Sequence, residues 1–329
     1  MEVDDINIVR FCILSVILFF GIPGNVMSFV VWTKGKNCSK SSSAIYFKLL
    51  AICDLLVLLI PGVDFFVYLF PKYNKDLRVI NIFLCKFLTF ASVYTRDISL
   101  GVTFALTIER TITVCRPFSA YNDNVRKRAY IIFTIITSLA FILNTPYLIV
   151  DEITDLKQNR NTTTAANTSE SNSYKKCTYM REPVHVKEII ELYNTIHFSC
   201  HVIIPVLVLT FCNSLILRTL CKDKKQSAQR GANTIKKSIH TVSLLVICIS
   251  IIHVLSTLPM SLRVISLYHE FNLNEFWTDF ANLVIQNLLF LNSGINCVLY
   301  CFIGIEFRQD LRNLCKTCCA RETLKEEHF

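Results

Sequence analysis

Charged residues are scarce in this chain: 18% of its 329 residues are Asp, Glu, Lys or Arg, whereas 52% are hydrophobic. A soluble domain of this length has more charge and fewer long apolar runs, so an ordinary soluble protein is excluded. Seven apolar stretches are each long enough to cross a bilayer, which takes about 20 helical residues. They lie at residues 9–31, 45–70, 82–114, 129–150, 189–220, 239–262 and 280–302. Barrel strands are only about 10 residues long and alternate in polarity, so we expect an all-α membrane protein, a seven-transmembrane helix bundle.

The sequence also lacks patterns that mark other membrane proteins. It has no internal repeat and no pair of matching interrupted helices, which argues against an inverted-repeat transporter. Paired catalytic carboxylates, a metal-ligand cluster and a nucleophile–base set are missing too, so an intramembrane enzyme is the least favoured class. The first apolar stretch has no small-residue cleavage pattern, and we expect it to stay as a signal anchor. A transporter or channel with an ion path through Asp54, Arg96 and Asp97 remains an alternative.

Basic residues gather in alternate loops, at residues 34–40, 126–128, 222–237 and 308–316. Positive charge marks cytoplasmic loops, so the acidic N-terminus is expected outside the cell. The net charge of +9 reflects this asymmetry, and we do not interpret it as nucleic-acid binding.

The longest loop, at about residues 151–187, falls on the predicted outer side. It is rich in Thr, Asn and Ser, and it holds two glycosylation sequons, at Asn161 and Asn167. A third sequon, at Asn37, lies on the predicted inner side and is expected to be silent.

The 15 cysteines separate by position. Most lie inside spans, where they act as small hydrophobic residues. Only Cys85 and Cys177 face the oxidising side without being deep in a helix, so we expect a disulfide between them. Cysteines after the last span stand beside basic residues and suit palmitoylation: Cys315, Cys318 and Cys319. Zinc binding or free thiols are the alternatives, although no His spacing supports a zinc site.

The third span carries a stripe of mostly polar residues at spacings of three and four, which is one helix face: Cys85, Thr89, Ser92, Arg96, Ser99, Thr103, Leu106 and Arg110. Such a face should point into the bundle. At about 1.5 Å per residue, Arg96 lies roughly 16 Å below Cys85. Arg96 and its neighbour Asp97 are either an internal ion pair or the floor of a ligand pocket.

Asp54 stands in the middle of the second span, where a lone carboxylate must be neutralised, paired or bound to a cation. Oxygen ligands for a hard cation could come from other spans: Asn25, Ser99, Asn292, Ser293 and Asn296. A proton relay is the competing explanation.

The fifth span has a polar stripe on its outer half, at Glu191, Asn194, His197 and His201. We expect this face to line the mouth of the bundle, although either His could be a satisfied core residue. Pro259 should kink the sixth span, because it removes a backbone hydrogen bond.

These residues together resemble the rhodopsin-like (class A) G-protein-coupled receptors over nearly the whole chain. The matching motifs, in order, are Gly24-Asn25, Leu50-Ala51-Ile52-Cys53-Asp54, Cys85, Glu109-Arg110-Thr111, Pro205, Pro259, the run from Asn292 to Tyr300, and Ile305-Glu306-Phe307-Arg308, which looks like the start of a short amphipathic eighth helix. Each match alone is weak, but their order and spacing are specific. The resemblance implies a bundle at residues 1–302, and an eighth helix with a cytoplasmic tail at 303–329.

The resemblance also implies roles for these residues. Glu109 holds Arg110 at rest and releases it to a G-protein α-subunit, and Tyr300 and Asn296 belong to the same switch. Asp54, Ser99, Asn292 and Asn25 form a pocket for an allosteric sodium ion, with no other cofactor or metal. The expected partners are an extracellular ligand, a heterotrimeric G protein, arrestin and the lipids of the plasma membrane.

Several residues depart from the family pattern. Thr111 replaces the usual Tyr, the fourth span has no Trp, and Cys297 replaces a Pro, so the seventh helix is expected to kink less. Thr257 stands at the aromatic toggle position, with His253 one turn earlier. The usual trigger of activation is therefore absent.

The resemblance is less informative about the ligand. Ser92 stands where amine receptors carry an Asp, and the seventh span has no central Lys for retinal, so a monoamine receptor and an opsin are disfavoured. The long outer loop and the FMRFamide-receptor-like runs at Leu143-Asn144-Thr145-Pro146 and Leu291-Asn292-Ser293 favour a neuropeptide. The expected pocket residues are Ser92, Arg96, Asp97, Glu191, His197, His201, Arg263, Asn282 and Gln286. Four carboxylates either receive a basic peptide residue or are solvated loop charges: Glu188, Glu191, Glu275 and Asp279. A chemosensory receptor for small molecules stays open.

Overall fold

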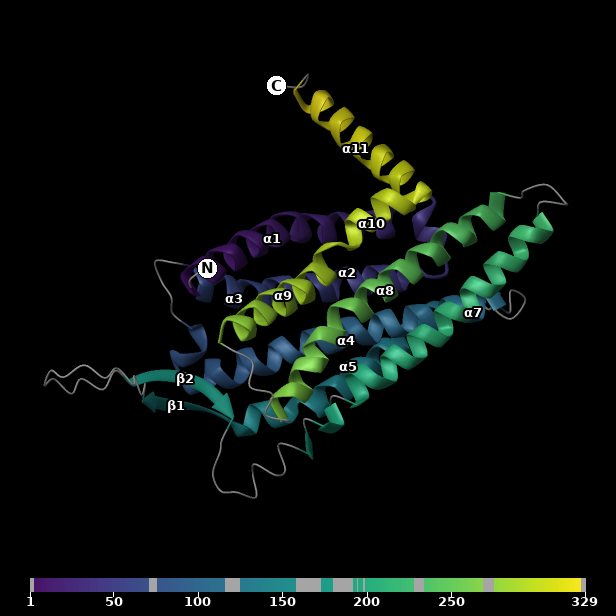
Figure 1. Cartoon of the computed structure of the whole chain (residues 1–329). Coiled ribbons are helices and arrows are strands. Elements are labelled where there is room, and N and C mark those ends of the chain that lie inside the picture. The colour runs from purple at the N-terminus through teal and green to yellow at the C-terminus, as the bar shows by residue number, and fades with distance from the viewer. Residues whose placement is uncertain are drawn as a thin grey trace, which may run out of the picture.

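The computed structural model describes residues 3–70, 76–115, 125–157, 173–179, 192–193, 195–197, 199–227, 234–268 and 275–326. Its long helices run side by side, and the N-terminus lies at the same end as the two strands (Figure 1). The last helix leaves the other end of the bundle at an angle. Four spans are single helices: α1 (Val3–Lys34), α4 (Ile82–Cys115), α5 (Val125–Val150) and α8 (Thr234–Tyr268). The fifth span includes α7 (Ile204–Ser227).

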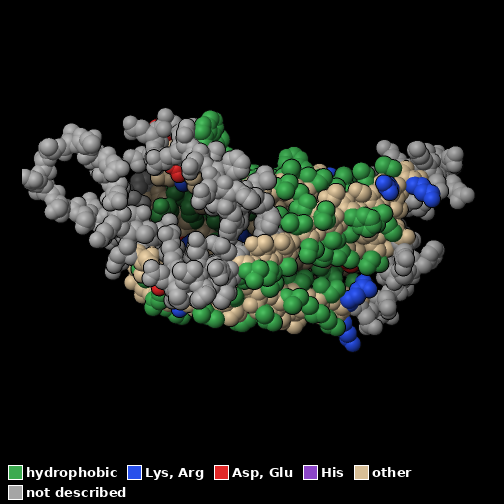
Figure 2. Space-filling model, turned by 60° about the horizontal axis from the view of Figure 1, so that its bottom comes forward, with side chains coloured by type: hydrophobic (Ala, Val, Ile, Leu, Met, Phe, Trp, Pro, Cys, Tyr) green, Lys and Arg blue, Asp and Glu red, His purple; other side chains and the backbone are tan. Residues whose placement is uncertain are grey.

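The helices confirm the predicted fold class. Within the described residues, six helices are long and apolar enough to cross a membrane, and a bent pair makes a seventh span. Figure 2 shows hydrophobic side chains along the flank of the bundle and Lys and Arg side chains gathered near one end. The chain is therefore a multi-pass membrane protein.

Three spans are interrupted, the second, the fifth and the seventh. The second consists of α2 (Ala44–Val57), a π-helical segment η2 (Leu58–Gly62) and α3 (Val63–Leu69). Pro61 lies inside η2 and has no N–H for the helical ladder. The described part of the fifth span includes a π-helical segment η4 (Ser199–Ile203) directly before α7.

The seventh span is divided into α9 (Glu275–Gly294) and α10 (Asn296–Ile303), which meet at 53°. A weak kink was expected here because Cys297 replaces proline, and that expectation is wrong. The bend falls directly after Gly294, and helices bend at glycine as well as at proline. Helix α10 is followed by α11 (Ile305–Glu326), which begins where the eighth helix was predicted and is 22 residues long.

The segment at residues 151–187 contains β-structure that the sequence reading missed. The strands β1 (Asp151–Lys157) and β2 (Ser173–Tyr179) pair antiparallel, with Ile153 opposite Cys177. Single 3₁₀ turns, η1 (Cys38–Lys40) and η3 (Leu77–Val79), lie before α2 and α4.

The centre of the bundle is α4, which packs against α2, α5, α7 and α8. The predicted stripe on this helix faces inward: Cys85, Ser92, Ser99, Thr103, Leu106 and Arg110 are all buried. An aromatic cluster packs at the end of the bundle opposite the strands, where Trp32 stacks on Phe47 at 4.2 Å between ring centres. The rings of Tyr300 and Phe307 contact this pair and each other, and so connect α1 and α2 with α10 and α11.

Small residues bring α1 close to α9. A Cβ added to Gly21 would lie 2.9 Å from the Cα of Gly294 and 2.9 Å from a methyl of Leu58, which is closer than real Cβ contacts allow. Without a hydrophobic force between helices in lipid, such close backbone packing is a main source of helix association.

We expect Gly21→Val to lower the free energy of unfolding by about 1–3 kcal/mol, the usual cost of overpacking. Thermal unfolding of the purified protein in detergent measures this. Val26→Ile also adds bulk to α1, but Val26 is 49% exposed on the outer surface, and its melting temperature should stay unchanged. A Gly21→Val protein as stable as the parent would contradict the close packing.

Candidate functional site

Arg110 and Glu109 lie buried at the inner end of α4 and form an ion pair, with Arg110 Nε 3.7 Å from Glu109 Oε2. Three serines at the start of α2 complete the cluster. Arg110 donates from Nε to Ser43, and from Nη2 to Ser41 and Ser42, each at 3.2 Å. Ser43 in turn donates to Glu109 Oε2 at 2.7 Å.

Four groups hold Arg110: the carboxylate of Glu109 and the hydroxyls of Ser41, Ser42 and Ser43. Glu109 was predicted as a partner of Arg110, whereas the serines were not. Their signal was visible, because three consecutive hydroxyl residues stand directly before an apolar span on the predicted inner side.

The other two residues of the predicted switch, Tyr300 and Asn296, are both buried in the bundle. Tyr300 is 1% exposed within the aromatic cluster, and its hydroxyl has no hydrogen-bond partner among the described residues. Asn296 donates from Nδ2 to Asp54 Oδ2 at 2.6 Å. In this structure neither residue has a recorded contact with Arg110 in the described part of the chain, and Asn296 belongs to the Asp54 site.

Asp54 is buried and accepts hydrogen bonds at both carboxylate oxygens. Ser99 donates to Oδ1 at 2.7 Å, and Asn296 donates to Oδ2. Neither donor carries a positive charge. The two asparagines expected here have other partners: Asn292 pairs with Nδ1 of His253 at 3.1 Å, and Asn25 donates to the carbonyl oxygens of Gly21 and Ser293.

Asn292, which was expected among the oxygen ligands of a sodium ion, contacts His253 of α8 through its Nδ2. Its role as a sodium ligand stays a prediction. The side-chain Oδ1 of Asn25 is buried without a hydrogen-bond partner among the described residues, so it remains available as an oxygen ligand.

Asp97 connects three helices in the outer half of the bundle. Its Oδ2 accepts from Asn144 Nδ2 of α5 at 2.6 Å and lies 3.3 Å from Nε2 of His197. Tyr147 and Tyr193 pack around His197 with ring centres 5.8–6.5 Å away. His197 is thus confirmed as an inward-facing residue, and Asn144, which the sequence reading did not place in the site, is buried in it.

The internal ion pair between Arg96 and Asp97 is not what the structure shows. Within the described residues, no oxygen of Asp97 is recorded within 4.0 Å of the Arg96 guanidinium, which donates from Nε to the carbonyl oxygen of Ser92 at 2.7 Å. Neighbours in a helix point about 100° apart, so the two side chains leave α4 in different directions.

The other predicted pocket residues are placed less completely. Asn282 and Gln286 lie half-buried on α9, and Ser92 is buried on α4. Glu191 and Glu188 lie outside the described residues, as do Asn194 and the sequons at Asn161 and Asn167. The backbone of His201, Arg263 and Glu275 is helical, but their side chains are not described. Cys315 is exposed on α11, where Cys318 and Cys319 also lie without described side chains.

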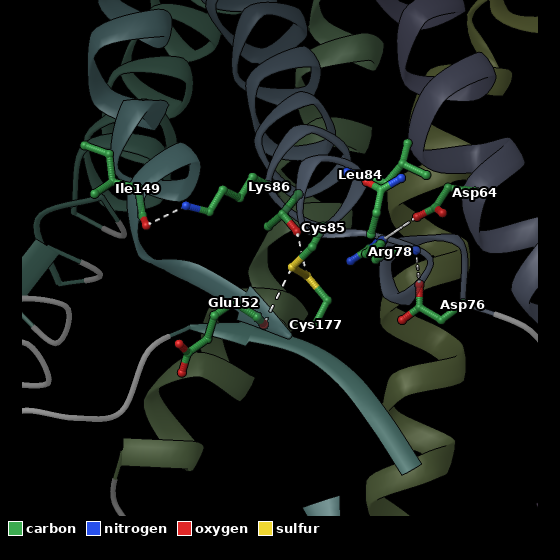
Figure 3. The surroundings of a disulfide bond; sticks show 11 residues. Asp64, Asp76, Arg78, Leu84, Cys85, Lys86, Ile149, Glu152 and Cys177 are labelled. Atoms are coloured by element: carbon green, nitrogen blue, oxygen red, sulfur yellow. Dashed lines mark hydrogen bonds and ion pairs between the residues drawn. A yellow bond between two sulfur atoms is a disulfide. The ribbon is translucent and has the colours of Figure 1, made fainter. Parts of the chain in front are cut away.

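A disulfide joins Cys85 at the start of α4 to Cys177 of β2, with the two Cα atoms 5.6 Å apart, which confirms the predicted pair. Figure 3 shows it beside two polar contacts at the rim. Arg78 donates from Nη2 to Asp64 at 2.6 Å, and Lys86 Nζ donates to the carbonyl oxygen of Ile149 at 3.1 Å. The disulfide fastens β2 to α4, the Arg78 contact fastens η3 to α3, and the Lys86 contact joins α4 to α5.

Asp151, the first residue of β1, is buried beside this disulfide. Burial raises its pKa from 3.8 to about 6, although a hydrogen bond from Thr89 and the charges of Arg78 and Lys86 act in the opposite direction. Between these two pH values the unfolded carboxyl ionises while the folded one holds its proton. The stabilisation that the Asp151 carboxyl contributes is therefore fully present below about pH 4 and is lost as the pH rises toward 6.

We expect Asp151→Asn to remove this part of the pH dependence. Thermal unfolding measured from pH 4 to pH 7 should decline less steeply between about pH 4 and 6 in the variant than in the parent. Glu152→Gln removes the neighbouring half-buried carboxyl and serves as the matched control, with the parental slope. An unchanged slope in Asp151→Asn would show that another group is responsible.

Comparisons with known proteins agree with this arrangement. A family model described as "7 transmembrane receptor (rhodopsin family)" matches residues 24–300. Galanin receptor type 1 of Rattus norvegicus is 22% identical over 319 residues, which cover 95% of this chain and 84% of that protein. The FMRFamide receptor of Drosophila melanogaster is 23% identical over 306 residues, which cover 90% of this chain and 52% of that protein.

A shorter match has higher identity. Leukotriene B4 receptor 1 of Homo sapiens is 31% identical over 160 residues, which cover 48% of this chain and 44% of that protein. This chain therefore spans less than half of the leukotriene relative and most of the galanin relative.

Proposed function

Because the chain belongs to the rhodopsin family of seven-transmembrane receptors, we propose that it binds an extracellular peptide and activates a heterotrimeric G protein. Members of this family are signalling receptors, so the chain is a receptor and not an enzyme. The proposal includes a plasma-membrane location with the N-terminus outside, arrestin and membrane lipids as further partners, glycosylation at Asn161 and Asn167, and palmitoylation at Cys315, Cys318 and Cys319.

One observation carries the proposal: a buried arginine at the inner end of the central helix, held by a carboxylate and by hydroxyls of a second helix. A buried charge is costly, and hydroxyls compensate it less than a carboxylate does. A small movement of α4 relative to α2 would separate Arg110 from the three hydroxyls, whereas Glu109 lies on α4 and would move with it. Such a movement frees the guanidinium for an oxygen acceptor on a cytoplasmic partner, and a ligand that prefers the moved state shifts the equilibrium toward it.

A sodium ion at Asp54 is the second part of the proposal. The carboxylate is buried with two neutral donors, and the buried Oδ1 of Asn25 is an oxygen without a partner among the described residues. Asp54, Ser99, Asn296 and Asn25 would hold the ion, because a hard cation takes carboxylate, hydroxyl and amide oxygens. Its charge would neutralise Asp54 and stabilise the resting arrangement of α2, α4 and α10.

A peptide ligand is supported by the relatives whose similarity covers nearly all of this chain, the galanin and FMRFamide receptors. A small-molecule ligand is the second candidate. It is favoured by the match to the leukotriene B4 receptor, which has the higher identity but covers only about half of this chain.

The experiment is a screen of a peptide library and a lipid library on cells that express the full chain with a promiscuous G-protein reporter. A response that is absent from cells without the receptor supports the proposal, and the active library decides between the two ligand classes. An ion current that needs no G protein, measured in reconstituted vesicles, would instead favour a transporter or channel.

A further inference from the structure

Arg96 is the charged group that the proposed switch and the sodium site leave without a role. It lies on the inward face of α4, about 16 Å below Cys85 at 1.5 Å per residue. Ser92 and Ser99, one turn above and one turn below, are 4% and 3% exposed. Arg96 itself is only half-buried, so part of this residue is accessible.

The guanidinium of Arg96 is poorly satisfied by the protein. Among the described residues it makes a single hydrogen bond, from Nε to Ser92, and no ion pair. Its two terminal nitrogens have no recorded partner in that part of the chain. An arginine has five N–H donors and cannot be deprotonated in a protein, so this charge needs an acceptor.

The neighbouring charges do not supply a bonded acceptor: the charge of Asp97 acts on Arg96, but the two side chains form no ion pair within 4.0 Å among the described residues. Asp97 contacts Asn144 and His197, which lie on other helices. Asp64 is paired with Arg78, whose positive charge acts on Arg96 and adds to the electropositive character of the space. Of the guanidinium groups of Arg78 and Arg96, only that of Arg78 has a carboxylate within ion-pair distance among the described residues.

A second group points to the same ligand chemistry. The hydroxyl of Ser92 is buried and has no hydrogen-bond partner among the described residues. It lies one turn above Arg96 on the same helix face, where a hydroxyl and a guanidinium can both donate to one pair of oxygens. A carboxylate presents two such oxygens and pairs with arginine through two parallel bonds.

The approach to Arg96 runs from the outer end of the bundle. Figure 2 shows a hollow near that end, with hydrophobic side chains on its floor and a few Lys or Arg side chains near it. Tyr147 and Tyr193 lie near the same level as His197 and Asp97. A ligand must reach about 16 Å inward, which takes roughly five residues of extended peptide at 3.3 Å each.

We propose that Arg96, assisted by Ser92, binds the carboxylate of the agonist at the floor of the pocket. This inference rests on the proposed receptor function and adds the ligand's chemical class, an elongated molecule that ends in a free acid. The acid is the C-terminus of a peptide or the head of a lipid acid, and an amidated peptide lacks it.

The test compares acids with their neutral derivatives on cells that express the full chain. The probes are a hexapeptide library prepared with free and with amidated C-termini, and fatty acids of 16 to 20 carbons with their methyl esters. We expect responses to the acid forms only, and the active panel identifies the source of the acid. Arg96→Gln should raise the half-maximal concentration about 30-fold or more, the usual effect of removing one partner of a buried charge pair, and Arg96→Lys should restore part of it.

Lys86→Gln is the matched control, because it removes an outer cation that contacts Ile149 and not the pocket. Its response should equal that of the parent. Equal potency of acids and their neutral derivatives, or an unchanged response in Arg96→Gln, would overturn the inference.

Direct binding separates this inference from the receptor function. The acid probes should raise the melting temperature of the purified parent protein and not that of Arg96→Gln. If no acid stabilises the parent, the carboxylate site is wrong, whatever the G-protein assay shows. If acids stabilise the parent but no G protein responds, the site stands and the proposed signalling function fails.

Discussion

Arg110→Ala is expected to reduce agonist-stimulated nucleotide exchange on the G protein about 30-fold or more, while ligand binding stays within a few-fold of the parent. The expected loss corresponds to about 2 kcal/mol, the lower end for removing one partner of a buried hydrogen-bonded charge pair. The ligand sites proposed above lie in the outer half of α4, so a change at its inner end should act on coupling. Nucleotide exchange in membranes and radioligand or fluorescent-ligand binding on the same preparation measure the two quantities.

The restraint on Arg110 can be tested in the opposite direction. Ser43 contacts both Arg110 and Glu109, so Ser43→Ala should weaken the resting arrangement and raise basal exchange. Lys127→Ala removes an exposed basic residue at the start of α5 and serves as the control, with parental coupling.

Misfolding is a competing explanation for a loss in Arg110→Ala, since Glu109 keeps its charge without a cationic partner. Surface expression and ligand binding distinguish the two cases, because a misfolded receptor loses both. Full coupling in a well-expressed Arg110→Ala protein would show that another group contacts the G protein. Unchanged basal exchange in Ser43→Ala would show that the serine is not a restraint.

The spans could be predicted because each depends on one continuous property, a run of apolar residues long enough for a bilayer. The inward stripe of α4 was predictable for a similar reason, since its residues repeat along a single helix. The disulfide followed from topology, which left Cys85 and Cys177 as the cysteines on the oxidising side.

Contacts between helices were harder to predict. Asn292 and Asn296 stand four residues apart on the seventh span, yet one meets His253 and the other meets Asp54. The bend after Gly294 lies between them, and periodicity within a helix does not show how two helices are rotated toward each other. Asn144 was missed as the partner of Asp97 for the same reason.

The strands β1 and β2 were missed because their sequences lack the alternation that marks a half-buried strand. Asp151-Glu152-Ile153-Thr154 and Ser173-Tyr174-Lys175-Lys176 are mostly polar on both faces. Their pairing depends on each other and on the disulfide, which joins β2 to α4 over 92 residues of sequence.

Cys177→Ser is therefore expected to have the second large effect, a loss of about 2–5 kcal/mol in the free energy of unfolding. A cross-link over a long loop restricts the unfolded chain, and here it also fastens β2 to the outer end of the central helix. Ligand affinity should fall with stability, since the strands lie at the mouth of the proposed pocket. Thermal unfolding and ligand binding of the purified protein measure both.

Cys85→Ser and the double variant are the decisive comparisons. Each single variant breaks the same bond. The double variant should therefore be about as stable as either single variant, apart from the small effect of replacing the second thiol by a hydroxyl. Cys12→Ser changes an exposed free cysteine on α1 and should leave both measurements unchanged. Reduction with dithiothreitol should bring the parent to the level of Cys177→Ser and leave that variant unaffected. If reduction had no effect on the parent while Cys177→Ser were unstable, the cost would come from packing of the Cys177 side chain, and the bond itself would contribute little.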